Sequence, residues 1–305
     1  MVERALPEAI VTSAPTTGPA ARRGPSFCSA LLAEPRVVIA GGFLLILALA
    51  AIFAPLITAH DPLEQDLMLN TLPPAWVDGA EPGYLLGTDS LGRDLLSRMI
   101  YGGRVALTVA LVAAFAAGLV GTVLGLLAGF FGGWIDAAVS RLIDIWMAFP
   151  PVLLSILLVA VIGTGLTSVI IAIVVIDWTR FCRVVRSETL QQARMDYVDA
   201  ATVLGTSRWR ILFSEILPNV LPVVVVLLSL EMGIAVIVEA VLSFVGLSVS
   251  SDMPTWGGLI AEGRQIIYQA WWVLVFPLIL LFATVLAFNQ LGDGLRRLVD
   301  PVLRR

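Results

Sequence analysis

Residues 105–129 read VALTVALVAAFAAGLVGTVLGLLAG, an uncharged run made almost entirely of aliphatic residues and glycine. A helix needs about 20 apolar residues to cross the hydrocarbon of a bilayer, so this run is long enough to span one. Small residues recur every four positions, at Ala113, Ala117, Gly121, Gly125, Gly129 and Gly133. Residues four apart share one face of a helix, where small side chains let a second helix approach closely. The stripe predicts a helix–helix contact, either within this chain or with another subunit.

Five further runs of similar length flank this one. Together the six runs lie at about 37–58, 105–129, 143–162, 167–186, 220–245 and 273–291. The first run is longer than the apolar core of a cleaved signal peptide, which has about 7–15 residues, so we expect it to remain as a helix. The pattern predicts an all-α polytopic membrane protein with six transmembrane helices.

The composition agrees with lipid as the main solvent of the chain. Of its 305 residues, 58% are hydrophobic and 14% are charged, and the mean hydropathy is +0.94. Soluble domains carry about 25% charged residues. The net charge of −4 gives no indication of a basic surface that would bind nucleic acid. All nineteen basic residues are arginine, which excludes a phosphate-loop lysine, a Schiff-base lysine and a kinase lysine in this chain. His60, Cys28 and Cys182 are too few to build a metal site of histidine and cysteine.

The distribution of arginine predicts the orientation of the chain. If the N-terminus is cytoplasmic and the six helices alternate, fifteen arginines lie inside and four lie outside. The outside arginines are Arg93, Arg98, Arg104 and Arg264. Because basic residues favour the cytoplasmic side, we expect both termini there. Residues 1–36 are rich in alanine, proline, serine and threonine and are predicted to form a disordered cytoplasmic tail, with the transmembrane domain at 37–305.

Three acidic residues fall within or at the edges of the predicted spans, namely Asp177, Glu231 and Glu239. An ionisable group in a span usually faces a cavity or a partner, so each is a candidate for the lining of a translocation pathway. Arg180 follows Asp177 by three residues, and a structural ion pair is the simpler interpretation there. Glu231 and Glu239 lie about two helical turns apart on one face, where they either line a pathway or accept structural hydrogen bonds.

Residues 188–222, between the fourth and fifth runs, read ETLQQARMDYVDAATVLGTSRWRILFSEILPNVLP. A short helix is expected at 195–204. One face of it would carry Tyr197, Val198, Ala201 and Leu204. Gly205 is placed to end this helix, and the Thr–Ser pair after it could cap a second helix at about 208–216. The pattern predicts a helix–turn–helix that projects into the cytoplasm, where its small residues expose backbone to a partner.

The same segment resembles the EAA loop of ATP-binding-cassette importer permeases. The matching residues are Asp199-Ala200-Ala201, then Gly205, then Ile216-Leu217-Pro218-Asn219. In that family the loop, here about 188–219, forms the coupling helix that seats in a groove of a separate ATPase subunit. The resemblance implies coupling roles for Tyr197, Asp199, Ala200, Ala201 and Gly205. Asp199 stands where the motif has glutamate, which keeps the charge and shortens the side chain by one methylene.

Motifs elsewhere resemble the dipeptide, oligopeptide and nickel group of these permeases, specifically its C-type subunit. They are LGTDSLGRD at 86–94, LSFVGL at 242–247, PTWG at 254–257, Trp271-Trp272 with Pro277, and NQLGDGLR at 289–296 with Asp300-Pro301. With the EAA-like loop they cover about residues 37–301. The resemblance implies the type I ABC importer permease fold and a non-catalytic, multi-pass subunit of a bacterial inner membrane.

The resemblance also implies the partners of the chain. A second, homologous permease subunit would enclose the pathway with it, and two cytoplasmic ATP-binding subunits would bind the two coupling loops. An extracytoplasmic substrate-binding protein would deliver di- or oligopeptides, and no nucleic acid would take part. ATP and Mg²⁺ would be bound by the partner ATPases, so this chain would hold no cofactor and no metal.

Three alternatives remain open from the sequence. An importer of nickel or another small ligand would have the same architecture, because a chelated metal needs no histidine cage in the permease. A proton-coupled secondary transporter or a channel is disfavoured by the EAA-like loop and by the lack of further titratable groups in the spans. A membrane scaffold that only recruits ATPases would leave the intramembrane glutamates without a role.

Overall fold

The computed structural model describes residues 34–248 and 253–299, and within these ranges the chain is helical and has no β-strand. The helices are α2 (Pro35–Ile52), α3 (Ala54–Ile57), α4 (Leu95–Phe131), α5 (Gly133–Met147), α6 (Pro151–Ile162), α7 (Leu166–Gln192), α8 (Asp196–Val203), α9 (Arg208–Arg210), α10 (Leu217–Phe244), α11 (Trp256–Gln265) and α12 (Trp271–Val299). A 3₁₀ turn lies at Leu67–Leu69 and a π-helical segment at Ile211–Ile216. The predicted all-α class is confirmed for the described residues, whereas most of the predicted tail, residues 1–33, lies outside them.

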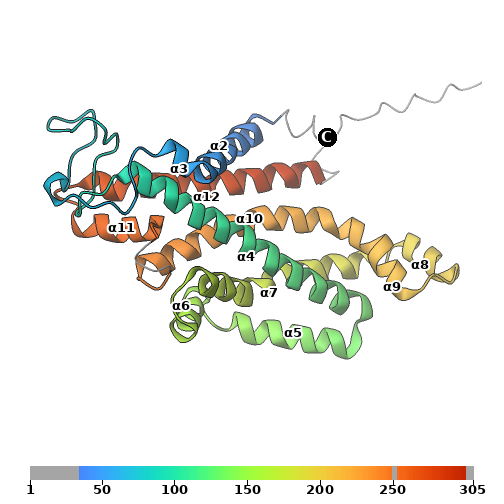
Figure 1. Ribbon diagram of the computed structural model, residues 1–305. Coiled ribbons are helices and arrows are strands. Elements are labelled where there is room, and N and C mark those ends of the chain that lie inside the picture. The colour runs from blue at the N-terminus through green and yellow to red at the C-terminus, as the bar shows by residue number, and fades with distance from the viewer. Residues whose placement is uncertain (1–33, 249–252, 300–305) are drawn as a thin grey trace, which may run out of the picture.

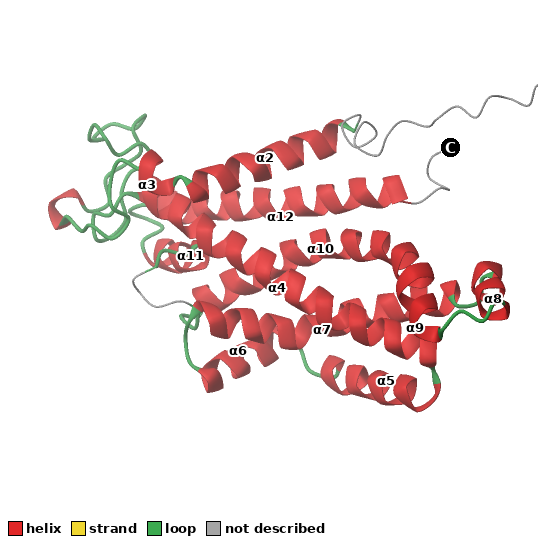
Figure 2. Ribbon diagram, turned by 45° about the vertical axis from the view of Figure 1, so that its right-hand side comes forward, coloured by secondary structure: helices red, strands yellow, loops and turns green. Residues whose placement is uncertain are grey.

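The long helices α4, α7 and α10 form the body of the molecule (Figure 1). On one flank α2 and α12 lie side by side, and α5 and α6 lie on the other flank (Figures 1 and 2). The loop of residues 58–94 and α11 gather at one end of the body, while α8, α9 and the last turn of α12 lie toward the other end. The EAA-like loop and the loop of residues 58–94 are therefore at opposite ends.

The small-residue stripe explains the close packing of α4 on α7. A Cβ atom at Gly121 would lie 2.5 Å from the Cβ atom of Phe181. One at Gly125 would lie 2.8 Å from the carbonyl oxygen of Cys182. Only glycine permits backbones this close, so the predicted helix–helix contact forms within the chain. Gly133 begins α5 and has open space around it, so the stripe ends one step earlier than predicted.

The described residues contain four helices that are long and apolar enough to cross a membrane, which are α2, α4, α10 with the segment before it, and α12. A fifth crossing results if α5 and α6 form one broken span, with an angle of 88° between them. The run predicted at 143–162 is therefore not one continuous helix, because the break between α5 and α6 falls inside it. Pro150 and Pro151 explain the break, because proline lacks an amide donor and disfavours helix at the residue before it. Helix α7 is 27 residues long, but the span predicted within it at 167–186 carries four charged side chains.

A side-chain cap makes α4 begin ten residues before the predicted span. Asp94 precedes the helix, and its carboxylate accepts a hydrogen bond from the backbone amide of Ser97 at 2.8 Å. Such a cap stabilises the first turn of a helix. The extended start brings Arg104 into α4, where its Nη2 atom donates to the carbonyl oxygen of Ile52 at 2.9 Å. The beginning of α4 is thereby joined to the end of α2.

Candidate functional site: coupling loop and buried charges

Helix α8, in the EAA-like loop, ends through two backbone hydrogen bonds of its final turn. Gly205 has a φ of +75°, and its amide donates to the carbonyl oxygen of Thr202 at 3.0 Å. The amide of Thr206 donates to the carbonyl oxygen of Ala201 at 3.1 Å. This pair of bonds is a Schellman motif, whose left-handed residue is usually glycine. The predicted short helix and its glycine stop are both confirmed, with each helix end shifted by one residue.

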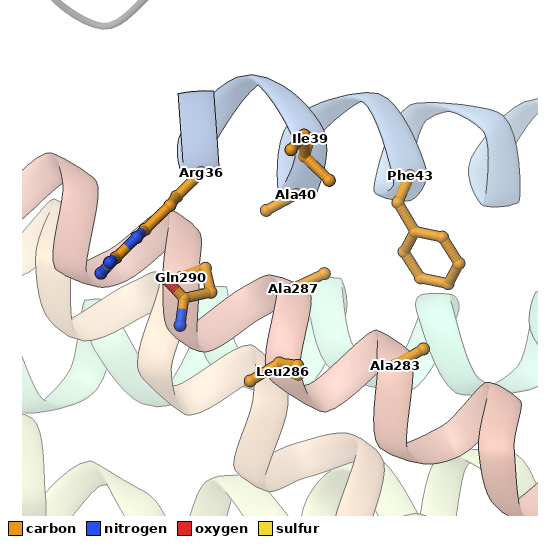
Figure 3. A pocket seen from close by; sticks show the side chains of 8 residues that line it. All are labelled: Arg36, Ile39, Ala40, Phe43, Ala283, Leu286, Ala287 and Gln290. Atoms are coloured by element: carbon orange, nitrogen blue, oxygen red, sulfur yellow. The ribbon is translucent and has the colours of Figure 1, made fainter. Parts of the chain in front are cut away.

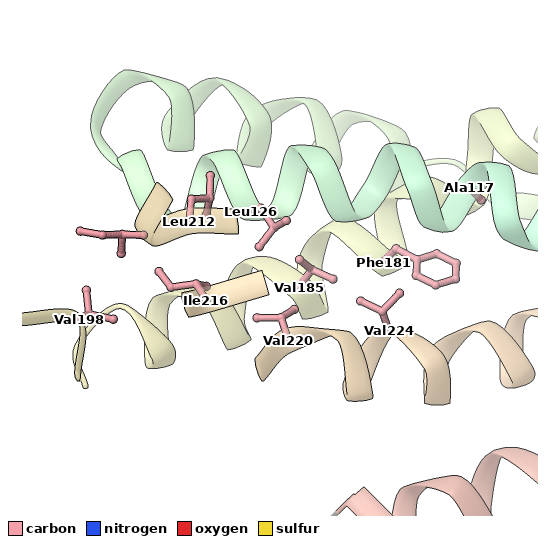
Figure 4. Close-up of a cluster of buried hydrophobic side chains, with 10 residues drawn as sticks. Ala117, Leu126, Phe181, Val185, Val198, Leu212, Ile216, Val220 and Val224 are labelled. Atoms are coloured by element: carbon pink, nitrogen blue, oxygen red, sulfur yellow. The ribbon is translucent and has the colours of Figure 1, made fainter. Parts of the chain in front are cut away.

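One face of α8 is anchored to the body of the protein. Val198 is buried in a cluster that includes Leu212 and Ile216, and this cluster continues along α4, α7 and α10 (Figure 4). Tyr197 and Ala201 pack against the same cluster. Because protein interiors are close-packed, α8 cannot be displaced without moving or disrupting these neighbours.

The opposite face of α8, which we call the outer face, consists of Asp199, Ala200, Val203, Leu204 and Gly205. All five residues are exposed, and Val203 and Leu204 are 87% and 84% exposed. A Cβ atom at Gly205 would meet nothing within 4 Å. The prediction that Leu204 shares the face of Val198 and Ala201 is wrong, because the helix ends at Val203 and Leu204 belongs to the exposed turn after it. Two adjacent, almost fully exposed apolar side chains are typical of an interaction surface, and sequence reasoning did not identify this pair.

The chain after Gly205 does not form the separate helix predicted at about 208–216. Instead α9 continues through the π-helical segment into α10, so that 208–244 is one continuous helical stretch. Ser207 has extended backbone angles, but its side chain makes no capping hydrogen bond. The π-helical segment ends at Ile216, two residues before Pro218, whose missing amide interrupts the regular hydrogen-bond pattern. The EAA-like loop is therefore continuous with α10.

Tyr197 connects α8 to the helices before and after it. Its hydroxyl group donates to Oε1 of Gln192, the last residue of α7, at 2.9 Å. The side-chain amide of Asn219, in the first turn of α10, donates to the same hydroxyl oxygen at 3.4 Å. Burial raises the pKa of Tyr197, so the phenol keeps the proton that it donates. A single side chain thus links α7, α8 and α10.

Asp177 on α7 and Glu231 on α10 are both buried, and their carboxyl groups lie beside each other. Arg180 stands between them, with Nε 3.7 Å from Asp177 Oδ1 and Nη1 3.6 Å from Glu231 Oε1. These distances are too long for hydrogen bonds, so the guanidinium group acts as a shared counter-charge. The predicted pairing of Asp177 with Arg180 is confirmed, and its extension to Glu231 joins the two helices that flank α8.

Glu239 is not part of this charged cluster. It is fully buried and accepts hydrogen bonds from Ser243 Oγ at 2.5 Å and Ser248 Oγ at 3.2 Å. Within the part of the chain that the structure describes, its Oε2 atom has no hydrogen-bond partner. The carbonyl oxygen of Ser248 accepts from the amide of Gly165 at 2.8 Å. Of the three acidic candidates, the structure thus brings Asp177 and Glu231 together and leaves Glu239 beside the turn before α7.

A second charged cluster lies at the opposite end of the molecule from α8. Asp89 accepts from Arg93 Nε at 2.7 Å and also pairs with Arg98. Glu262 on α11 lies 2.9 Å from Arg98 Nη1 and 3.1 Å from Arg93 Nη2, and accepts from Ser90 Oγ at 2.6 Å. Burial raises the pKa of Glu262, but Arg98, Ser90 and Arg93 together outweigh it and hold that pKa below its ordinary value.

Sequence reasoning did not identify Glu262 as a member of this cluster. It is 164 residues away from Arg98 along the chain, and no local pattern connects the two. The pair becomes visible only when α11 packs against the beginning of α4. Two acidic and two basic side chains then balance each other at the entrance to α4.

Two known families match separate parts of the chain. Residues 121–305 match the family described as binding-protein-dependent transport system inner membrane component. Residues 29–74 match the N-terminal transmembrane domain of oligopeptide transport permease C. These two matches agree with the resemblance found in the EAA-like loop and in the motifs around it.

Individual relatives cover most of the chain as well. The di/tripeptide transport system permease protein DppC of Pseudomonas aeruginosa is 38% identical over 262 residues, which is 86% of each chain. The dipeptide transport system permease protein DppC of Escherichia coli is 40% identical, over 86% of this chain and 88% of the relative. The glutathione transport system permease protein GsiD of Pectobacterium atrosepticum is 36% identical over 91% of each chain.

A solved structure shares the fold. It is described as an inward-facing conformation of the MetNI methionine ABC transporter, with a TM-score of 0.58 and 21% identity, and the match covers 68% of this chain and 98% of that one. The family match, the relatives and the apolar helices agree with one another. The chain therefore belongs to the family of inner membrane components of binding-protein-dependent transport systems, and it is an integral inner-membrane protein.

Proposed function

We propose that this chain forms half of the translocation pathway of an ATP-binding-cassette importer for short peptides. The three relatives compared above are named for dipeptides, di/tripeptides and glutathione, and glutathione is itself a tripeptide. A homologous permease forms the other half, and an extracytoplasmic binding protein delivers the peptide. The chain itself catalyses nothing, because two cytoplasmic subunits bind ATP and Mg²⁺ and hydrolyse the nucleotide.

The chain crosses the membrane six times in this proposal, through α2, α4, the broken pair α5 and α6, α7, α10 and α12. Helix α7 crosses despite its charges because Asp177 and Arg180 face Glu231 on α10 rather than lipid. Both termini and α8 are cytoplasmic. This orientation is supported by the arginine distribution and by the common position of α8 and the last turn of α12 at one end of the molecule (Figure 1).

The observation that carries the proposal is the two-sided character of α8. Its inner face is joined by Val198 and Tyr197 to α7 and α10, while its outer face is bare. We infer that the outer face seats in an ATPase subunit, which covers Val203 and Leu204. Closure of the ATPases would then displace α8 together with the helices attached to it, and so shift the permease between two arrangements.

The charged cluster of Asp177, Arg180 and Glu231 borders the pathway in this proposal. The Arg180 side chain is 37% exposed, so part of its guanidinium group is accessible from outside the cluster. A dipeptide carries an ammonium and a carboxylate group, and the cluster presents charges of both signs. Glu239 is proposed to position the turn before α7 at the outer end of the pathway, through its bonds to Ser243 and Ser248.

The test is a tagged pull-down from native membranes in mild detergent, with the subunits identified by mass. We expect a second permease, two ATPase domains and a substrate-binding protein to co-purify. The double variant Val203→Glu/Leu204→Glu should retain the second permease and lose the ATPases. Recovery of the chain alone in repeated mild detergents would contradict the proposal. Screening the recovered binding protein with dipeptides and with nickel chelates then decides between the two classes of substrate.

A further inference from the structure

A groove runs between α2 and α12 along the flank of the protein. Its volume is about 450 Å³, within the range of about 300–1,000 Å³ typical of small-molecule sites. It is lined by Arg36, Ile39, Ala40, Phe43, Ala283, Leu286, Ala287 and Gln290 (Figure 3). The two polar residues, Arg36 and Gln290, lie at one end of the groove, and Phe43 and Ala283 lie at the other.

The shape of the groove follows from the packing of the two helices. Gly294 lets α12 approach Val37 on α2 closely, whereas Ala40 and Ala287 are too small to fill the space that follows. At its rim, Ile39 is 72% exposed and Leu286 is 45% exposed. An apolar groove with exposed aliphatic walls on a membrane helix pair is poorly suited to water or to a charged peptide, and well suited to a hydrocarbon chain.

The polar end of the groove carries a positive charge where α2 begins and α12 ends, two helices long and apolar enough to cross a membrane. Arg36 lies in the first turn of α2, and within residues 34–248 and 253–299 it makes no ion pair. Arg296 and Arg297 lie in the last turn of α12, and Arg297 pairs with Glu34 at 2.6 Å, whereas the described part of the chain offers Arg296 no ion pair. Basic side chains at the mouth of a groove between transmembrane helices are typical of sites for anionic phospholipid head groups.

We propose that this groove binds one phospholipid with an anionic head group. One acyl chain lies along Ile39, Ala287 and Phe43, and the phosphate group contacts Arg36, whose guanidinium donors suit phosphate oxygens. The side-chain amide of Gln290 offers a further donor beside it. The bound lipid would fill the gap between α2 and α12 and hold α2 against the body. The proposal rests on the membrane location of the chain and not on its substrate or on the docking of ATPases.

The first test counts lipids bound to the complete transporter. The complex is purified in detergent, incubated with vesicles of equal parts phosphatidylglycerol and phosphatidylcholine, purified again, and its phospholipids are measured by class. We expect phosphatidylglycerol to exceed phosphatidylcholine about fivefold, as one arginine near an anionic surface would produce. Arg36→Gln should abolish this preference, and Ala283→Leu should lower the total by obstructing the groove. The controls are Arg141→Gln and Ala160→Leu, exposed residues of α5 and α6 away from the groove.

The second test identifies what occupies the groove in the assembled transporter. Ile39 is replaced by the photoreactive residue p-benzoylphenylalanine, and the illuminated complex is analysed by mass. A phospholipid adduct on this chain supports the proposal. An adduct with the second permease would overturn it, because a protein helix would then fill the groove. Equal binding of the two lipid classes by the unmodified protein would also overturn it, and so would the absence of any adduct.

Discussion

Arg180 on α7 places its Nη1 atom 3.6 Å from Oε1 of Glu231 on α10, so the two helices on either side of the EAA-like loop are joined by charge within the body of the protein. Tyr197 joins the same helices where they meet α8. The two connections lie at different depths, and both respond to the relative position of α7 and α10. A displacement of α8 is therefore expected to alter the charged cluster.

Removal of the shared counter-charge should impair transport. In Arg180→Gln the neighbouring carboxyl groups of Asp177 and Glu231 lose their cation in a poorly solvated region, where uncompensated charge is costly. We expect uptake by the reconstituted transporter to fall strongly, and Glu231→Gln in the same chain to restore part of it. The matched control is Arg183→Gln, an exposed arginine on α7 that makes no ion pair within the described residues.

A double-mutant cycle distinguishes this account from a simple loss of packing. If the two positions interact through charge, the effect of the double variant on uptake is smaller than the sum of the effects of the single variants. Additive effects of Arg180→Gln and Glu231→Gln would show that the pair is not functionally coupled.

Loss of the Tyr197 hydroxyl group should weaken coupling without unfolding the chain. Tyr197→Phe removes the hydrogen bond to Gln192 and leaves the ring in its cluster. The expected cost is about 0.5–1.5 kcal/mol. Peptide transported per ATP hydrolysed should decrease, as measured in proteoliposomes. Tyr268→Phe is the control, because Tyr268 is fully exposed, and an equal decrease in both variants would contradict the proposed link.

Close packing of α4 on α7 should tolerate no added methyl group at the centre of the stripe. In Gly121→Ala the new Cβ atom would lie 2.5 Å from the Cβ atom of Phe181, so the helices must separate. Overpacking of this kind costs about 1–3 kcal/mol. The thermal midpoint of the solubilised protein should fall accordingly. Gly41→Ala, where the new methyl group would meet nothing within 4 Å, should leave it almost unchanged, and equal effects would argue against the contact.

The amino-acid sequence predicts most of what depends on local patterns. Apolar runs give the positions of α2, α4, α10 and α12, and Gly205 gives the end of α8, because these features depend on composition and on backbone conformation. Pro150 and Pro151 indicate the break between α5 and α6, but a search for long apolar runs does not take proline into account. The early start of α4 also had a local signal, in the capping position of Asp94.

Other features depend on contacts between distant segments and could not be predicted in this way. The pairing of Glu262 with Arg98 needs the docking of α11 on α4, and the pairing of Glu231 with Arg180 needs the docking of α10 on α7. The exposure of the Leu204 side chain depends on where α8 ends and on which of its residues pack against the other helices. Motif resemblance identified the EAA-like loop as a whole, and the packing of α8 separates its anchored face from its exposed one.

The cluster around Glu262 should make the outer end of the protein sensitive to acid. The folded-state pKa of Glu262 lies below its ordinary value of 4.5, so its ionised form stabilises the fold. This contribution is present above pH 4.5 and is lost as the pH falls below 4.5 through the folded-state pKa. Glu262→Gln should cost about 1.5–3 kcal/mol at neutral pH and remove this part of the acid dependence.

Thermal unfolding of the solubilised complex, followed as a function of pH, measures this effect. The control is Glu64→Gln, an exposed glutamate in the same end of the molecule. If Glu262→Gln and the unmodified protein lose stability in parallel as the pH falls, the ionisation of Glu262 does not contribute to the pH dependence of stability.

The outer face of α8 is the centre of this account, and Gly205→Glu tests it most directly in the reconstituted transporter. Gly246→Glu is the matched control, since Gly246 has a φ of +81° and open surroundings on a different loop. We predict that Gly205→Glu lowers peptide uptake roughly tenfold or more and abolishes the stimulation of ATP hydrolysis by substrate, a loss typical of coupling between sites. Its amount in the membrane should stay normal, and Gly246→Glu should keep both activities. Normal uptake and normal stimulation in Gly205→Glu would contradict the assignment of α8 as the coupling helix.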